Sequence, residues 1–417
     1  MSGKTYTLAI IIICLSRLTD HWLRMSPIPF FPEIMAGFDV GYAGVGVLFS
    51  VLSIALITMQ MPAGIIVDRF PAPMISAIGM GIVGAGGVAF ALAPSYGVAM
   101  AARIAMGVGG PLSEVASIAM ISRLSPPRAR GRTIGFVDMS VGFAYFLALG
   151  ILPFVSQYLD YRMILLIPAL SAILMATMTL NMSRYSILRP DESSMQSRPT
   201  GSIASSPTTL RDKSCELFSR IRATLGNRAI LLLSIMAFLG FAAGDAMMVW
   251  LPTYLQDIRN YTHDGASMVM VVTLAVYVPG ALLAGRASDA WRLRIRVVQV
   301  GSVLMGLAYI GILSSPADHI LLLLGPLFGV GYAWNVGPML TLATEKVRPA
   351  SMGMAVSLVF MFAQLGTAVS GALLGQLVEY FEGFTVIWVV AVALLTLRLT
   401  ISSSPHFSGD TPVDPPQ

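Results

Sequence analysis

The chain has 417 residues, of which 56% are hydrophobic and only 11% are charged, and its formal net charge is +5 at pH 7. A soluble domain carries about 25% charged residues, so the composition excludes water as the main solvent of this chain. The positive balance does not indicate nucleic-acid binding, because the Lys and Arg residues are spread over many loops rather than gathered in one patch.

Twelve apolar stretches each have roughly the 20 residues that a helix needs to cross a bilayer. They predict membrane-spanning helices near residues 5–24, 43–66, 74–93, 97–121, 133–156, 163–182, 229–251, 266–285, 297–314, 320–343, 352–376 and 384–401. Lys4 and the apolar run after it resemble a secretory signal, but no small-residue cleavage pattern follows. We therefore expect the first stretch to be retained as a helix.

Landmark residues of the first six stretches recur in the last six at a nearly constant spacing. The recurring pairs are Gly64 and Gly285, Asp68 and Asp289, Gly107 and Gly329, Gly131 and Gly353, and Asp20 and Asp245. Transporters built from such repeats place their solute site near the midplane between the repeats. The sequence therefore predicts an all-α membrane protein made of two pseudo-symmetric six-helix bundles.

The two bundles are expected at residues 1–182 and 229–401. Residues 183–228 between them predict a cytoplasmic linker loop, in which 210–225 is either an amphipathic interfacial helix or a solvated connector. Residues 402–417, rich in Pro and Ser, predict a disordered tail. Most Lys and Arg residues lie in loops on the side of the two termini, which predicts cytoplasmic termini and a place in the cytoplasmic membrane.

Short motifs occur along the chain in a characteristic order. They are Gly64 to Arg69 after the second stretch, Arg103 with Gly107 in the fourth, Pro127 to Gly131 before the fifth, and Trp250 to Tyr254 at the end of the seventh. In this order they resemble the motifs of the major facilitator superfamily of secondary transporters, over about residues 4–401. The match at the first motif is partial, because 71–73 are Pro, Ala and Pro where Gly and basic residues are usual. The resemblance implies twelve helices and alternating access.

The repeated loop motif predicts a gate formed by Gly64, Asp68, Arg69, Gly285 and Asp289. A carboxylate beside a helix N-terminus meets unsatisfied N–H groups and the positive end of the helix dipole. Asp68 is expected to reach the start of the eleventh span and Asp289 the start of the fifth, so both contacts cross between the halves. They would close the cytoplasmic side in one state only. The alternative is a carboxylate that simply caps a turn.

Ionisable residues inside the spans are functional candidates, because a charge there costs about 2.5–3.5 kcal/mol on insertion scales. The first span carries a polar stripe at helical spacing, made of Arg17, Asp20, His21 and Arg24. The predicted proton-coupling or ion-pair residues are Asp20, Arg103, Glu114, Asp138 and Asp245. The alternative for each is an ion pair that only holds helices together.

Three specific arrangements are expected among these residues. Arg103 is expected to pair with Asp20, since both lie in the outer half of their spans, and Glu114 is expected to share a proton with Asp138. Arg24 is expected to reach the membrane interface, and His21 is either a site residue or part of an interfacial aromatic belt. A divalent cation held by Asp20, His21 and Asp245 is a minor alternative.

The residues expected to bind solute are Arg17, Tyr277, Trp334, Asn335 and Gln364, with interhelical packing as the alternative role. We predict a secondary active transporter, coupled to protons, that moves a small polar or ionic solute such as an organic anion and works as a monomer. Proton-driven efflux of cationic or amphipathic compounds, divalent-cation transport and a receptor on the same fold remain alternatives. No metal or other cofactor is expected, the sequence has no ATP-binding Gly-rich motif, and its four scattered His do not indicate an enzyme.

Overall fold

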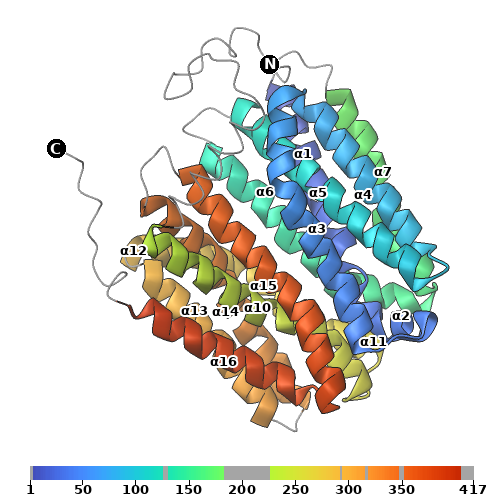
Figure 1. The fold of residues 1–417 in the computed structure, drawn as a ribbon, viewed down its shortest axis with the longest axis vertical. Helices are drawn as coiled ribbons and strands as arrows, with labels where there is room; N and C mark the ends of the chain where they lie inside the picture. Colours follow the sequence, from blue (N-terminus) through green and yellow to red (C-terminus); the bar gives the residue numbers. More distant parts are fainter. Residues whose placement is uncertain are drawn as a thin grey trace.

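The computed structural model describes residues 3–124, 130–182, 226–291, 294–314, 318–346 and 352–404, and every regular element in these ranges is a helix (Figure 1). Twelve stretches of the described residues are long and apolar enough to cross a membrane: Tyr6–Phe38, Tyr42–Val67, Ala72–Ala91, Tyr96–Ile121, Met139–Gln157, Tyr161–Asn181, Arg228–Asp257, His263–Ser288, Arg294–Ser314, Ile320–Ala343, Ala355–Phe381 and Thr385–Ser402. The predicted all-α fold with twelve spans is therefore confirmed, and the chain is a multi-pass membrane protein.

Helices of the first half are α1 (Gly3–Met25), η1 (Ile28–Phe30), α2 (Phe31–Phe38), α3 (Tyr42–Arg69), α4 (Ala72–Ala91), α5 (Tyr96–Leu124), α6 (Arg130–Tyr145), η2 (Phe146–Ile151), η3 (Leu152–Gln157) and α7 (Tyr161–Asn181). Helices of the second half are α10 (Arg228–Asp257), α11 (His263–Ala275), α12 (Tyr277–Trp291), α13 (Arg294–Ser314), α14 (Asp318–Glu345), α15 (Met352–Phe381) and α16 (Thr385–Ser402). The division into two domains stays a prediction, because most of the expected linker and tail lie outside the described residues.

The first span is longer than the sequence pattern indicated. α1 ends just before Pro27, which lacks a backbone donor and so cannot continue the helix. The chain then re-enters helical structure in η1 and α2, where Phe30 and Ile34 are fully buried. A residue in left-handed conformation, Asp39 at φ 53°, ends α2. The span therefore runs to Phe38 rather than to residue 24.

Equivalent glycine crossings hold helices together in both halves. A Cβ added at Gly79 of α4 would lie 2.6 Å from the carbonyl oxygen of Gly109 in α5, and one at Gly301 of α13 would lie 2.8 Å from that of Gly331 in α14. These backbones approach so closely because neither residue has a side chain, which is how small residues drive helix packing in a bilayer. The same contact at equivalent places in the two halves agrees with the internal repeat.

Helix α15 joins the halves by packing along α3. A Cβ at Gly46 of α3 would overlap the backbone of Gly371 in α15. Nearby, the Ser50 hydroxyl donates to the Ala368 carbonyl oxygen at 2.5 Å and accepts from the Ala372 N–H at 2.7 Å. The two helices are therefore in backbone contact along this stretch.

Further contacts between the halves lie at one end of the bundle, which carries the N-terminus of α3 and the C-terminus of α15 and is called the outer end here. Figure 1 shows α2 and α11 at this end, away from the N-terminus of the chain. The contacts are Tyr42 with Asp257 at 2.9 Å, Gln256 with the Pro29 carbonyl at 3.0 Å, and His263 with Glu33 at 2.6 Å. The structure is thus closed at the outer end.

Candidate functional site

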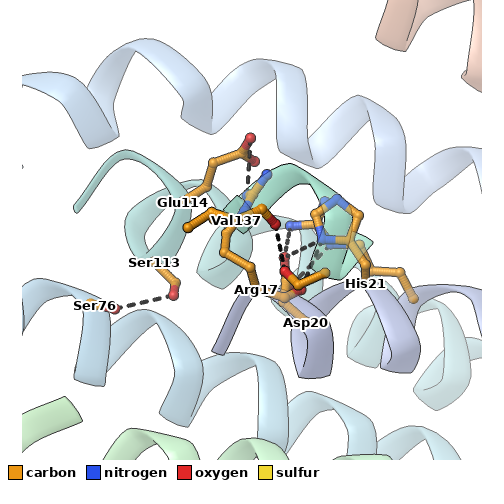
Figure 2. A network of polar contacts seen from close by, with 9 residues as sticks. Arg17, Asp20, His21, Ser76, Ser113, Glu114 and Val137 are labelled. Carbon is orange, nitrogen blue, oxygen red and sulfur yellow. Dashed lines mark hydrogen bonds and ion pairs between the residues drawn. The ribbon is translucent and has the colours of Figure 1, made fainter. Parts of the chain in front are cut away.

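The polar stripe of α1 lies inside the first half and forms two ion pairs. The guanidinium of Arg17 lies 3.1 Å from Glu114 of α5, and Figure 2 shows these residues together with Asp20 and His21. The guanidinium of Arg24 lies 2.5 Å from Asp20, one turn back on the same helix. All four side chains of these pairs are at most 10% exposed. Both carboxylates are therefore neutralised by a cation where they are buried.

Two expectations for this region are wrong. Arg24 does not reach the membrane interface; it is only 4% exposed, and the missing side chain of Gly110 makes room for its guanidinium. Arg103 does not pair with Asp20, because Arg24 occupies that carboxylate.

Arg103 instead bonds to backbone carbonyls. It donates to the carbonyl oxygens of Leu48 at 3.2 Å and Arg24 at 3.1 Å, and its guanidinium lies 5.5 Å from the centre of the Phe90 ring. The Arg24 carbonyl is in the last turn of α1, where carbonyls lack helical partners and the helix dipole favours a cation. Arg103 therefore joins α5 to the end of α1 and to α3.

Asp245, at the centre of α10, accepts hydrogen bonds from two neutral side chains. The Tyr332 hydroxyl of α14 donates to its Oδ1 at 2.6 Å, and the Thr367 hydroxyl of α15 donates to its Oδ2. The residue is 7% exposed. Within the described parts of the chain, no Lys, Arg or His forms an ion pair with this carboxylate. Asp245 thus differs from its repeat partner Asp20, which has an arginine.

The sequence contained a signal for this difference. When Asp245 is aligned on Asp20, the places of Arg17 and Arg24 are taken by Ala242 and Val249. The seventh span therefore repeats the carboxylate of the first span without its two cations. Tyr332 and Thr367 could not be identified as partners from the sequence, because they come from two other helices.

Several aromatic residues lie on the side of Asp245 that Tyr332 contacts. The ring of Tyr332 lies 5.9 Å from that of Tyr277 and stacks on Phe328 at 5.7 Å. The Tyr145 hydroxyl of α6 is close enough to interact electrostatically with Asp245 and with Tyr277. Because α6 belongs to the first half and α10, α12 and α14 to the second, this group of residues lies between the two halves.

The other predicted solute-binding residues take different positions. Tyr277, Trp334 and Gln364 are half-buried. Asn335 is 1% exposed; its side chain donates to the Gly331 carbonyl at 2.8 Å and accepts from Arg398 of α16. In this conformation its hydrogen bonds connect helices.

Sequence reasoning missed Arg398, which is fully buried in α16. It donates to the Ser302 hydroxyl at 3.1 Å as well as to Asn335, and Gly240 of α10 leaves the space that its guanidinium fills. The available signal was its position within the apolar stretch 384–401.

Several expected site residues have side chains outside the described set, namely Asp68, Asp138 and Asp289. Gly64 and Gly285 lie within α3 and α12, with no atoms of other residues within 4 Å of an added Cβ, and Arg69 is exposed. The gate and the proton shared by Glu114 and Asp138 therefore stay predictions. Asp20, His21 and Asp245 do not form a metal site, because no three His, Cys, Asp or Glu side chains gather in the described residues.

Comparison with known proteins gives one family for the whole chain. The family model of the Major Facilitator Superfamily matches residues 13–371 and 260–406. The fold resembles a bacterial homolog of the human lysosomal transporter Spinster in an inward-facing, unoccupied conformation, with a TM-score of 0.78, 17% identity, and 96% of this chain and 97% of that chain covered. It also resembles a D-xylose–proton symporter, with a TM-score of 0.74, 16% identity, and 97% and 99% covered.

Curated relatives match over shorter stretches. A probable vesicular acetylcholine transporter-B of Danio rerio is 26% identical over 151 residues, which cover 34% of this chain and 30% of that protein. The drug efflux pump JefA of Mycobacterium tuberculosis is 28% identical over 131 residues, which cover 31% of this chain and 26% of that protein. The aligned stretches thus span less than a third of either relative.

Proposed function

Because the chain belongs to the Major Facilitator Superfamily, we propose that it is a secondary active transporter that moves a small polar or ionic solute by alternating access and couples this movement to protons. Solute and proton exchange at a central site between the halves. With the termini in the cytoplasm, the closed outer end faces away from the cytoplasm.

The proposal rests on Asp245, a buried carboxyl group with no cationic partner among the described residues. A buried carboxylate that no cation neutralises is costly, and uptake of a proton removes the cost. The hydroxyls of Tyr332 and Thr367 stabilise the ionised form in turn. Burial favours the protonated form of Asp245 and the two hydroxyls favour its ionised form, so this carboxyl group can bind and release a proton during a transport cycle. Asp20 and Glu114 are less suited, since each already holds an arginine.

Three variants in proteoliposomes test this assignment. A panel of sugars, peptides, nucleosides, organic anions and organic cations is first screened for solutes that raise the melting temperature of the purified protein. Accumulation driven by a pH gradient and solute exchange at equal pH are then measured for the native protein, for Asp245→Asn and for Glu114→Gln. The matched control is Asp39→Asn, an exposed carboxylate at φ 53°, a conformation that Asn adopts equally well.

Asp245→Asn is expected to lose accumulation. Exchange measured at a saturating solute concentration is expected to persist, because exchange needs no net proton movement. Glu114→Gln separates this assignment from the predicted sharing of a proton between Glu114 and Asp138. It is expected to keep accumulation when Asp245 carries the proton, and it would lose accumulation if Glu114 did. Accumulation by Asp245→Asn at the native level would overturn the assignment of Asp245 as the proton-carrying group.

A further inference from the structure

We propose that the solute is an organic cation, an amine or quaternary ammonium compound, bound by the Asp245 carboxylate among the rings of Tyr145, Tyr277 and Tyr332. This inference rests on the proposed transport function and names the chemical class that its site takes. The four residues come from α10, α6, α12 and α14, so they lie between the two halves that alternating access moves.

The geometry fits a cation with an apolar body. Asp245 supplies a formal negative charge, and its two hydrogen bonds come from neutral hydroxyls. The Tyr332 hydroxyl donates to the carboxylate. The centres of the Tyr277 and Tyr332 rings are 5.9 Å apart and their planes meet at 42°, so the two rings are tilted rather than stacked. Aromatic faces attract cations through their quadrupole, and a set of rings beside a carboxylate is the usual way to hold an alkylammonium group.

Two of the three tyrosine side chains are partly exposed. Tyr145 and Tyr277 are half-buried, whereas Tyr332 is held against α10, where the missing side chain of Gly244 accepts its ring. The Tyr145 ring also lies 6.3 Å from the ring of His21 on α1. The two half-buried rings are therefore the ones that a solute would meet first, whereas Tyr332 is packed against α10.

An organic anion would require an arginine turned toward this site. Arg17 and Arg24 are bound to Glu114 and Asp20, and the buried guanidinium groups of Arg103 and Arg398 donate to backbone carbonyls or to Ser302 and Asn335. Among the described residues, none of these cations forms an ion pair with a group of the aromatic site. The charge at the site is therefore that of Asp245.

A single carboxylate that binds either a proton or a cation gives exchange of one for the other. The charged and titratable groups of the described residues around Asp245 are Tyr309 on α13, Tyr332 on α14, Tyr277 on α12, Tyr145 on α6 and, beyond Tyr145, His21 and the two ion pairs of α1. The carboxylates in this set other than Asp245 are Asp20 and Glu114, and each of them is paired with an arginine. Binding of the solute therefore releases the proton from Asp245, and a low pH weakens solute binding.

Binding to the purified full-length protein tests this inference. The probes are tetraethylammonium, benzyltrimethylammonium and tetraphenylphosphonium, with tetraphenylborate as an anion of the same shape as the last. Affinity is measured by isothermal titration calorimetry at pH 6 and pH 8 in two buffers of different ionisation enthalpy, which reports the protons released. The variants are Asp245→Asn, Tyr277→Ala and the exposed control Asp39→Asn.

At least one cation is expected to bind the native protein in a saturable way, with affinity higher at pH 8 and with proton release. Asp245→Asn is expected to lower this affinity by about tenfold or more and to abolish proton release, Tyr277→Ala to lower it by about three- to tenfold, and Asp39→Asn to leave it unchanged. Tighter binding of tetraphenylborate, equal binding by Asp245→Asn, or no cation bound at all would overturn the inference. If an uncharged solute then accumulated in a way that depends on Asp245, the proposed transport function would still stand. If a cation bound at this site but was not transported in proteoliposomes, the proposed function would be overturned and the binding site would stand.

Discussion

Glu379, near the end of α15, accepts a hydrogen bond from the backbone N–H of Ala43 in the first turn of α3, with 2.9 Å between the two atoms. A carboxylate of the second half thus caps a helix of the first half. Because an anion at a helix N-terminus stabilises it by about 0.3–1 kcal/mol, this contact favours the closed state of the outer end. A carboxylate that caps a helix of the other half was expected at the cytoplasmic loops. The contact of Glu379 is of this type but lies at the outer end of the bundle.

Glu379→Gln is therefore expected to loosen the outer end. The amide keeps the size of the side chain and loses its charge, so the first turn of α3 should open more often. Hydrogen–deuterium exchange of a peptide covering residues 40–50 is expected to speed up about two- to fivefold, the equivalent of 0.3–1 kcal/mol. Glu382→Gln, an exposed carboxylate close by, serves as the control. Equal exchange rates in the two variants would show that the contact does not hold the outer end closed.

The pair of Arg17 and Glu114 is expected to behave as one unit in stability. Removal of one partner leaves a buried charge without compensation, which costs about 3–5 kcal/mol. Arg17→Gln and Glu114→Gln should each lower the melting temperature of the purified protein strongly, and the double variant should be more stable than Arg17→Gln alone. If the two single effects add in the double variant, the ion pair does not contribute as a unit.

The observed pair of Asp20 and Arg24 can be compared with the pair of Asp20 and Arg103 that the sequence predicted. Asp20 and Arg24 are in contact, so their single changes to Asn and Gln should not add, with a coupling of about 0.5–3 kcal/mol. The effects of Asp20→Asn and Arg103→Gln on the free energy of unfolding should be closer to additive, because Arg103 bonds to backbone carbonyl oxygens and not to Asp20. Thermal unfolding of the two sets of single and double variants measures both couplings. A larger coupling for Asp20 with Arg103 would restore the pairing that the structure contradicts.

These pairs show how far the sequence could predict the site. Helical spacing placed the residues of α1 on one stripe, and apolar length gave all twelve spans, since a bilayer tolerates few other arrangements. Spacing along one helix does not say which helices pack together, and Arg103 was assigned to the wrong partner for that reason. Asp20 and Arg24, four residues apart, already had the spacing of an ion pair within one helix. The neutral partners of Asp245 come from distant helices and required the structure.

The contact of α3 with α15 leads to a prediction about conformation rather than about binding. A Cβ at Gly46 would overlap the backbone of Gly371, whereas a Cβ at Gly81 of α4 would meet no atom of another residue within 4 Å. Excess volume in a packed contact costs about 1–3 kcal/mol. In Gly46→Ala this cost falls on the state in which the two helices touch, so the variant should spend more time open at the outer end.

Spin labels on the outer ends of α3 and α15 can measure the population that is open at the outer end, because electron paramagnetic resonance gives the distribution of distances between the two labels. Gly46→Ala is expected to move the distance distribution toward longer values, with an outward-open fraction at least about fivefold higher, as 1 kcal/mol requires. Gly81→Ala should leave the distribution unchanged, since its added methyl group has free space. A lower melting temperature of Gly46→Ala with an unchanged distribution would mean that α3 and α15 stay in contact throughout the cycle, and the outer end would then not be a gate.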